Sequence, residues 1–279
     1  MTRFILKNNQ LINENQASIS INERGFLFGD GIFETCKIFA GRIYDYKSHE
    51  ARIKKGLAAL KITADIGDLE KNSKKLIAKN KIENGILRIS ITRGVGSNGY
   101  LPENKIQALI IIQTFDERKL PKKISLNISA IKKPTSNSFP ITHKTNNALP
   151  YVLNKIAANE AGFFDSIMLS ANNFITETSA ANIFWIKNNK IYTSSKSCDI
   201  LPGTIRARLI KISSIKIIEK EAKLSELKNA DEVFLTNSAS LIIFVDEIDF
   251  GNGLIKKFLK KNSAKMQALL LEDVKNYCK

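Results

Sequence analysis

The chain has few of the side chains that hold metal ions or build disulfides, with two histidines and three cysteines among 279 residues. The cysteines, Cys36, Cys198 and Cys278, lie far apart, and an odd number without a CxxC pair favours neither a disulfide framework nor a zinc site. We therefore expect reduced thiols, no metal, and no mechanism built on clustered imidazoles. Catalysis must use lysine, carboxylates, hydroxyls or a cofactor.

Long hydrophobic runs are also absent. The longest purely apolar runs, such as residues 108–112, have the length of a strand and fall far short of the roughly 20 residues that cross a membrane. The first residues, MTRFILK, lack the uninterrupted apolar segment of a secretion signal. We expect a cytoplasmic protein without a membrane partner.

Acidic residues are scarce relative to basic ones, and the formal net charge is +16. Such an excess has three explanations: a solvated surface, steering of an anionic substrate, or binding of nucleic acid. The excess is mostly lysine, in pairs far from one another in sequence, at 54–55, 74–75, 122–123, 132–133 and 260–261. Dispersed pairs favour a solvated surface first and substrate steering second, and predict no nucleic-acid partner.

The hydrophobic pattern alternates between strand and helix periods and predicts an α+β protein. The length predicts two domains, because domains average about 150 residues. Residues 1–115 predict a small N-terminal domain, 116–123 a polar linker with one proline, and 124–279 a larger, strand-rich C-terminal domain. Ser48 is the expected cap of the first helix. Helices are expected near residues 48–60, 68–79, 147–160, 203–211 and 254–271.

A glycine-rich segment, RGFLFGDGIFET at residues 24–35, is the first candidate for chemistry. Gly29 and Gly31 bracket an aspartate, and glycines at this density allow positive φ and close approach of backbone to a neighbour. The pattern leaves two interpretations open, a tight structural turn and a loop that faces a ligand.

Three further segments add reactive groups. Lys144 precedes a predicted helix; a lysine withdrawn from solvent beside cationic groups becomes an amine nucleophile, although most lysines simply lie at the surface. Glu177 stands in the otherwise uncharged ITETSAAN, where a carboxylate needs a cation such as a pyridinium or the hydrogen bonds of a turn. Residues 201–206, LPGTIR, place a proline and a glycine at a helix start, which can bind phosphate. Together these groups suit an aldehyde cofactor that carries a phosphate.

Seven segments then follow one another in order along nearly the whole chain: FGDGIFET, SHEARI, ITRGVGSNGY, HKTNNALPYVL, ITETSAANIFW, LPGTIR and FLTNSAS. They resemble the fold-type IV pyridoxal-phosphate enzymes, the family of branched-chain and D-amino acid aminotransferases and 4-amino-4-deoxychorismate lyase. The resemblance implies a homodimer whose chain has a smaller N-terminal α/β sandwich and a larger C-terminal pseudo-barrel. It also implies that pyridoxal 5'-phosphate is the cofactor and lies between the domains.

By this resemblance, Lys144 binds the cofactor aldehyde, Glu177 pairs with the pyridine nitrogen, and Arg52 holds the phosphate. A guanidinium suits phosphate because it donates two parallel hydrogen bonds. The backbone amides of Thr204 and Ile205 would complete the phosphate site. The aminotransferases have Ile then Thr here, whereas this chain has Thr then Ile, so the resemblance supports the backbone contacts but not a hydroxyl contact.

Within the family, four features favour the lyase. Thr35 stands where branched-chain aminotransferases have glycine, and Asn237 stands where aminotransferases tend to have threonine. The segments RGVGSNGY and AANIFW resemble lyase segments. Asn237 is also expected to contact the cofactor. Asn98 departs from the pattern, since lyases and D-amino acid aminotransferases have there an arginine that binds a substrate carboxylate. Asn98 and Tyr100 are kept as substrate-binding candidates, and Arg93 or a nearby lysine is the hypothesis for the missing carboxylate partner.

The resemblance therefore predicts elimination of pyruvate from 4-amino-4-deoxychorismate, an anionic substrate, to give 4-aminobenzoate, a folate precursor. Lys144 would move the protons with Thr35 as its orienting partner, and Glu177 would keep the pyridine nitrogen protonated. Two alternatives stay open: a D-amino acid or branched-chain aminotransferase, and a non-catalytic basic binding protein. The first would exchange amino groups with an amino acid, and the second would be colourless.

Overall fold

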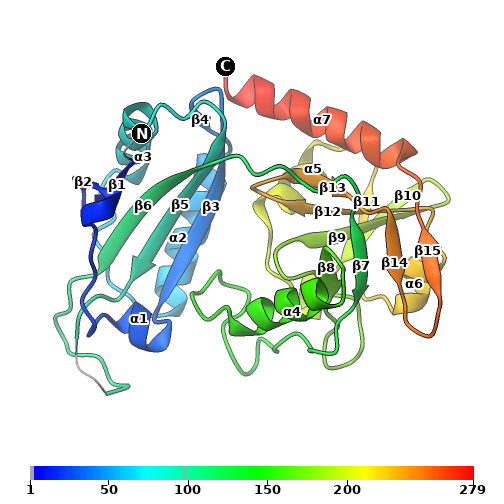
Figure 1. The fold of residues 1–279 in the computed structure, drawn as a ribbon, viewed down its shortest axis with the longest axis horizontal. Helices are drawn as coiled ribbons and strands as arrows, with labels where there is room; N and C mark the ends of the chain where they lie inside the picture. The colour runs from blue at the N-terminus through cyan, green and yellow to red at the C-terminus, as the bar shows by residue number, and fades with distance from the viewer. Residues whose placement is uncertain (1–2, 97–98) are drawn as a thin grey trace. The chain divides into compact units, whose positions relative to one another are not determined.

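The computed structural model describes residues 3–96 and 99–279. The chain forms two compact units (Figure 1): unit 1 comprises Met1–Arg118, His143–Asn147 and Val274–Lys279, and unit 2 comprises Lys119–Thr142 and Ala148–Asp273. Both combine sheets with helices, which confirms the α+β class. The chain leaves unit 1 within the stretch expected to be a linker, and it returns to unit 1 twice. The division into domains at residues 1–115 and 124–279 with a linker between them stays a prediction.

Unit 1 contains one six-stranded sheet with the order β2-β1-β6-β5-β3-β4, antiparallel throughout. Buried residues alternate along most of β5 and from Ile32 to Cys36 of β3, because successive side chains of a strand point to opposite faces. One face of the sheet can therefore be apolar while the other carries polar groups. The strands are β1 (Phe4–Lys7), β2 (Gln10–Asn13), β3 (Gly31–Phe39), β4 (Arg42–Ile43), β5 (Gly85–Thr92) and β6 (Leu109–Asp116).

Two helices, α2 (Tyr46–Ala59) and α3 (Leu69–Lys79), pack on the apolar face of this sheet and close its core. Two shorter helices, η1 (Glu14–Gln16) and α1 (Arg24–Phe28), precede β3. The expectation that Ser48 caps the first long helix is wrong. Asp45 is the N-cap, with the left-handed φ of 50° that aspartate tolerates, and α2 already begins at Tyr46.

Unit 2 contains a five-stranded sheet, β11-β10-β9-β12-β13, and a four-stranded sheet, β15-β14-β7-β8. Both sheets contribute to one core, for example Leu126 and Ile167 from the smaller sheet and Ile183, Trp185 and Leu235 from the larger. Two sheets around one core agree with the expected C-terminal pseudo-barrel. The strands are β7 (Ser125–Ile128), β8 (Asp165–Ile167), β9 (Asn182–Lys187), β10 (Lys190–Ser194), β11 (Ile217–Lys220), β12 (Glu232–Asn237), β13 (Leu241–Phe244), β14 (Glu247–Asp249) and β15 (Ile255–Lys257).

The helices of unit 2 are α4 (Leu149–Glu160), η2 (Lys196–Cys198), α5 (Thr204–Ile212), α6 (Leu224–Lys228) and α7 (Lys261–Tyr277), the last of which ends in unit 1. The expected helix over 254–271 is wrong in its first part, because β15 pairs there with β14. Gly251 and Gly253, with φ of 85° and 76°, form the turn between these strands, and α7 begins only after it.

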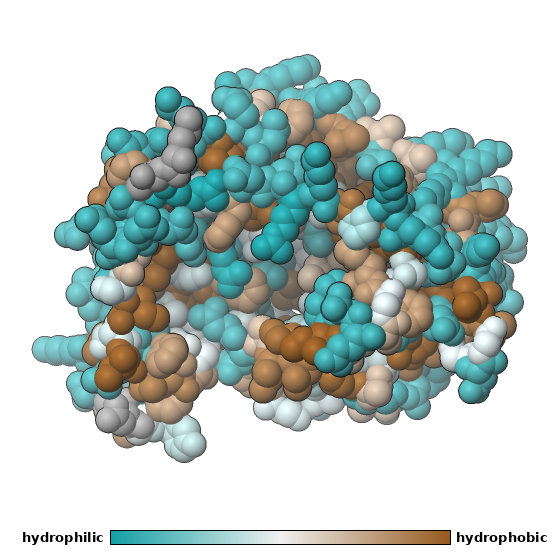
Figure 2. All heavy atoms as spheres, in the orientation of Figure 1, coloured by the Kyte–Doolittle hydropathy of each residue, from teal (hydrophilic) through white to brown (hydrophobic). Residues whose placement is uncertain are grey.

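The surface is mostly hydrophilic, as the lysine content predicts, but Figure 2 shows hydrophobic side chains gathered over α1 and over α4. The exposed apolar residues of α4 are Leu149, Val152, Leu153 and Ile156. Lys133 departs from the expected solvated surface, because it is only 2% exposed. Within residues 3–96 and 99–279, no helix combines the length and the apolar character that a membrane span needs.

Candidate active site

Lys144 lies on a short segment that pairs with the start of β3. The N–H of Phe33 donates to the carbonyl of Lys144, and the N–H of Asn146 donates to the carbonyl of Gly31, both at 2.9 Å. The Lys144 ammonium nitrogen lies 4.4 Å from the centroid of the Phe33 ring. Main-chain bonds therefore fix the backbone of this lysine, and the face of an aromatic ring stabilises its cation.

Gly29, just before β3, and Gly31, its first residue, make room for the lysine segment. Gly29 has φ of +65°, and a Cβ there would lie 2.7 Å from the side-chain oxygen of Asn147. A Cβ on Gly31 would lie 2.7 Å from the carbonyl oxygen of Ile91. The Asn147 side chain also donates to the Gly29 carbonyl at 2.9 Å. Of the two interpretations left open, the structure supports the turn, which packs closely against residues 146 and 147.

Thr35 and Arg88 lie on the face of the sheet that carries Phe33, away from the helices. Thr35 is opposite Arg88 across β3 and β5, and residues two apart on a strand share a face. The Arg88 guanidinium carbon lies 4.4 Å from the Phe33 ring centroid, so Arg88 and Lys144 both contact one ring. Burial lowers the pKa of Arg88.

Arg88 is a candidate that the sequence analysis did not identify. Among the residues that the structure describes, no hydrogen bond or ion pair engages its guanidinium, so its N–H groups can bind an anion. A carboxylate is the natural ligand, because it accepts two parallel hydrogen bonds from arginine. The signal was a lone charge in the strand pattern GILRISIT.

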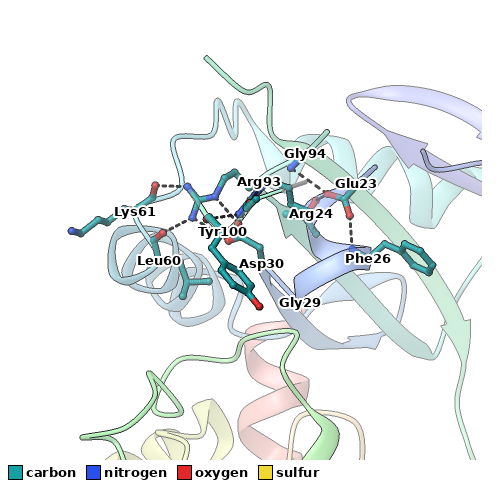
Figure 3. A network of polar contacts seen from close by, with 12 residues as sticks. Glu23, Arg24, Phe26, Gly29, Asp30, Leu60, Lys61, Arg93, Gly94 and Tyr100 are labelled. Carbon is teal, nitrogen blue, oxygen red and sulfur yellow. Dashed lines mark hydrogen bonds and ion pairs between the residues drawn. The ribbon is translucent and has the colours of Figure 1, made fainter. Parts of the chain in front are cut away.

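Arg93, in contrast, is engaged within unit 1 (Figure 3). Its guanidinium donates to the Asp30 carboxylate at 2.7 and 3.0 Å and to the carbonyls of Leu60 and Lys61 at 2.8 Å. Burial opposes ionisation of Asp30, but Arg93 and Arg24 outweigh it and lower the pKa of the carboxyl. These bonds connect the end of β5 with the end of α2. A contact of Arg93 with substrate stays a prediction.

Arg24 holds the backbone of residues 99 and 100 (Figure 3). Arg24 donates to the carbonyls of Gly99 and Tyr100 at 2.7 and 2.9 Å. Tyr100 is 90% exposed, and its ring centroid lies 5.7 Å from that of Phe28. Asn98 lies outside the described residues. The substrate contacts expected for Tyr100 and Asn98 stay predictions.

Arg52 lies on α2 and is oriented by a buried carboxylate. Glu34 of β3 accepts from Arg52 Nε at 2.5 Å and from Nη2 at 2.7 Å, and His49 Nδ1 lies 2.8 Å from Glu34 Oε2. Burial raises the pKa of Glu34, but the Arg52 guanidinium and His49 outweigh burial and hold it at about 2. A carboxylate that stays charged fixes the direction of Arg52, as binding of a phosphate requires. No pattern in the sequence indicates that Glu34 and His49 act together.

Glu177 lies just before β9 in unit 2 and is 5% exposed. It accepts from the Asn182 side chain at 2.9 Å and from the backbone N–H of Leu201 at 3.1 and 3.2 Å. Buried Lys133 also donates to it. The carboxylate that the sequence singled out is therefore held by amide donors and one ammonium.

Asn182 connects Glu177 with the start of α5. Its side chain also donates to the Leu201 carbonyl at 2.9 Å, and a Cβ on Gly203 would lie 2.0 Å from its oxygen. Gly203 is the N-cap of α5 and provides no side-chain cap. The helix therefore begins with backbone N–H groups, at Thr204 and after, that favour an anion.

Two loops complete this part of unit 2. The Thr204 hydroxyl lies 3.0 Å from the hydroxyl of Ser238, whereas Ile205 is buried. Asn237, at the end of β12, accepts from the N–H of Ser240 at 2.8 Å and so shapes the loop that carries Ser238. The contact of Asn237 with the cofactor stays a prediction.

The chemistry of these groups fits pyridoxal phosphate. Unit 1 offers an amine at Lys144 and an oriented guanidinium at Arg52, and unit 2 offers the Glu177 carboxylate and the start of α5. Because Gly203 has no side chain, the Asn182 amide packs directly against the start of α5, whose first N–H groups favour an anion such as phosphate. Within unit 1, Lys144 contacts Phe33 on the face of β3 that also carries Thr35, whereas Arg52 contacts the other face through Glu34.

Comparison with known proteins identifies similar chains over nearly the full length. The profile of the family described as "Amino-transferase class IV" matches residues 31–248. A D-alanine aminotransferase of Bacillus licheniformis is 28% identical over 277 residues, which are 96% of this chain and 98% of that protein.

Two solved structures are also similar. The branched-chain amino acid aminotransferase of Escherichia coli has a TM-score of 0.89 at 21% identity, over 98% of this chain and 94% of that one, a likeness of fold. A Legionella pneumophila protein designated "Putative 4-amino-4-deoxychorismate lyase" has a TM-score of 0.82 at 27% identity, over 93% of this chain and 97% of that one. Similar chains therefore bear the names of both transferases and lyases.

Proposed function

This chain belongs to the class IV aminotransferase family, whose members depend on pyridoxal phosphate, and from this premise we propose that it is a 4-amino-4-deoxychorismate lyase. The observation that carries the proposal is the position of Thr35 on the face of β3 where the Lys144 ammonium contacts Phe33. A hydroxyl and an ammonium on one face can pass a proton to a departing oxygen group. The resemblance associates threonine at this position with lyases.

Each residue then has a defined task. Lys144 removes the proton from the ring carbon that bears nitrogen and returns a proton to the departing pyruvate, while Thr35 orients its ammonium. Glu177 holds the proton on the pyridine nitrogen, so that the bound cofactor supplies an electron sink. Arg52, with the backbone start of α5, holds the phosphate. Arg88 binds a carboxylate of the substrate, a task that suits a guanidinium for which the described part of the chain provides a ring contact but no hydrogen-bond acceptor.

An aminotransferase is the second candidate. It is favoured by the near full-length likeness to the D-alanine aminotransferase. The same lysine would then move a proton between two carbon atoms of an amino acid, and Arg88 would bind the carboxylate of that amino acid.

A direct assay separates the two. Protein loaded with pyridoxal phosphate is incubated with 4-amino-4-deoxychorismate, made from chorismate and glutamine by an amidating synthase, and 4-aminobenzoate is measured. Parallel samples receive D-alanine or L-leucine, and the absorbance of the pyridoxamine form is followed. We expect 4-aminobenzoate that disappears in Lys144→Ala. No 4-aminobenzoate together with amino-group exchange identifies a transaminase, and a colourless protein identifies neither enzyme.

We also infer a homodimer. The exposed apolar residues of α4 recur at the spacing of one helix face, and they are Leu149, Val152, Leu153 and Ile156. Exposed stripes of this kind mark an interface, and a second copy of the chain can cover one with its own.

A further inference from the structure

Lys133 is a buried lysine to which the proposed function gives no task. It lies between β7 and α4, and its side chain has no exposed surface. Its ammonium donates to Glu177 and to the Tyr151 hydroxyl oxygen, the latter at 2.7 Å. Burying an ammonium costs several kcal/mol unless it is paired, so a lysine at this position needs a reason. Its neighbour Lys132 is exposed, so a lysine at this point of the chain can reach solvent, and the burial of Lys133 is specific to that residue.

The first consequence of this contact concerns the charge of Glu177. Burial lowers the pKa of Lys133, but Glu177 and Tyr151 outweigh burial and raise it, so Lys133 remains an ammonium. An ammonium in contact with a carboxylate favours its ionised form. The carboxylate that faces a pyridine nitrogen must be ionised, because a protonated acid cannot hold a second proton on that nitrogen. Lys133 thus supports the one property of Glu177 on which its task depends.

The second consequence concerns the direction of the Tyr151 proton. An ammonium has only donors, so the Tyr151 oxygen must accept the hydrogen bond from Lys133. The Tyr151 proton then points away from Lys133. Burial raises the pKa of Tyr151 while Lys133 opposes the shift, and the net rise keeps the hydroxyl protonated. Among the described residues no acceptor takes this proton, so it is available to a bound molecule.

We propose that Lys133 is a positioning residue, which keeps Glu177 ionised and directs the Tyr151 hydroxyl proton to an acceptor oxygen of the molecule bound against Glu177. The proposal rests on the proposed function for the identity of that molecule. Its effect on Glu177 and Tyr151 is a property of the protein without cofactor and can be measured there.

The test compares the thermal stability of cofactor-free Lys133→Met and Glu177→Gln at about pH 6 and about pH 9. Removing Lys133 leaves a buried carboxylate that binds a proton more tightly than in the unfolded chain, so this variant loses stability as the pH rises. Removing the Glu177 charge leaves a buried ammonium that releases its proton more easily than in the unfolded chain, so this variant gains stability as the pH rises. We expect Tm values roughly 5 °C or more below wild type, with opposite pH slopes.

Controls exclude a role in packing alone. Lys132→Met changes the exposed neighbour and should shift Tm little at either pH. Lys133→Arg restores charge and donors and should remove the pH slope, and the double variant Lys133→Met/Glu177→Gln should lose less than the sum of the single variants. Equal losses at both pH values, or additive losses in the double variant, overturn the proposal. If Lys133→Met does not fold, Lys133→Arg and the slope of Glu177→Gln still decide.

Two spectroscopic measurements complete the test. The difference between the ultraviolet titration curves with Tyr151 and with Tyr151→Phe isolates the ionisation of the Tyr151 phenol. In the Lys133→Met background this ionisation should occur at higher pH than in wild type, because the neighbouring cation is lost. The dissociation constant of pyridoxal phosphate is measured for Lys133→Met and for wild type, and the ratio of the two is compared at each pH. This ratio should rise severalfold from about pH 8 to about pH 6, because Glu177 of the variant has lost the ammonium that favours its charged form. An unmoved phenol titration and a constant ratio overturn the proposal. If wild type binds no pyridoxal phosphate, the proposed function fails while the cofactor-free measurements still judge Lys133.

Discussion

Lys144 and Lys133 belong to different units and meet different partners, an aromatic ring in one case and a carboxylate in the other. In the proposed site Glu177 pairs with the pyridine nitrogen, so a lysine that contacts Glu177 would not be the one that binds the cofactor aldehyde. The position of each lysine therefore decides its chemistry.

We predict that borohydride reduction of the protein loaded with pyridoxal phosphate labels Lys144 and leaves Lys133 unmodified. Peptide mapping by mass spectrometry measures this. Lys144→Ala should lose the yellow colour and at least about a thousandfold in activity, because the proposed mechanism assigns both the bond to the cofactor and the proton transfers to this amine. Lys133→Met should keep its colour. A label on Lys133 would contradict the assignment and, with it, the roles proposed for both lysines.

Arg88 and Arg93 form a second matched pair. Arg88→Gln should raise KM for the substrate roughly tenfold or more without changing Tm, because a charge-assisted hydrogen bond to substrate is lost. Arg93→Gln should instead lower Tm, because its bonds to Asp30, Leu60 and Lys61 are internal. Steady-state kinetics and thermal unfolding measure both. A raised KM with unchanged Tm in Arg93→Gln would return the carboxylate to Arg93, the residue that the sequence favours.

Three basic residues have environments that the sequence alone does not predict. Lys132 and Lys133 are identical neighbours in sequence, yet the first is exposed and the second is buried. Arg88 was visible only as one charge in a strand pattern. What distinguishes such residues is the partner across space, and Glu177 stands far from Lys133 in the chain.

At the scale of elements, β3 serves two purposes because its side chains alternate. Glu34 faces α2 and orients Arg52, and the next residue, Thr35, lies on the face of Phe33 and Arg88. One strand thus positions the partner of Arg52 on one face of the sheet and Thr35 on the other.

Glu34→Gln should destabilise the protein by about 3–5 kcal/mol at neutral pH, because it breaks a buried ion pair. The folded-state pKa of Glu34, about 2, lies below the ordinary value of 4.5. The stabilisation is therefore complete above that ordinary value and is lost as the pH falls toward 2. Wild type and variant should converge over this window in denaturant titrations.

The control for this prediction lies on the same helix. Glu50 pairs with Lys54 at the surface, and Glu50→Gln should cost less than about 1 kcal/mol. Glu34→Gln should also weaken binding of pyridoxal phosphate more than binding of pyridoxal, since it releases Arg52. A pH-independent loss, or equal weakening for both ligands, would contradict the role of Glu34.

The boundaries of elements were predicted well where side chains determine them and poorly where the backbone does. The helix near 68–79 agrees with α3, whose N-cap Asp68 accepts from the N–H of Lys71. Ser48 was a plausible cap, but the left-handed backbone of Asp45 begins α2 earlier. The apolar residues near 254 fitted a helix, but the turn at Gly251 and Gly253 leads instead into a hairpin of β14 and β15.

At the scale of the whole molecule, the stripe on α4 predicts the assembly. Val152→Glu with Ile156→Glu should convert a dimer into monomers, because charge in an apolar interface is costly. Lys265→Glu, at an exposed position of α7, should leave the dimer intact. Light scattering coupled to size exclusion gives the mass. A monomeric wild type, or a dimeric double variant, would contradict this interface.

The class of the fold could be predicted because strand and helix patterns depend on local sequence. The path of the chain could not, because residues 143–147 join unit 1 through main-chain hydrogen bonds. Such bonds leave no pattern of apolar and polar side chains. The motif marked Lys144 by type, and only the pairing with β3 explains the glycines that come before it.

Asn147 bonds to a residue 118 positions earlier in the chain, and the backbone of the reactive amine has the same distant support. A larger side chain at Gly29 or Gly31 would displace that amine without ever touching it. A screen for colourless mutants will therefore collect changes at these glycines together with changes at Lys144. Variants at Gly29 or Gly31 would keep the Lys144 side chain but lose the close packing that positions its backbone.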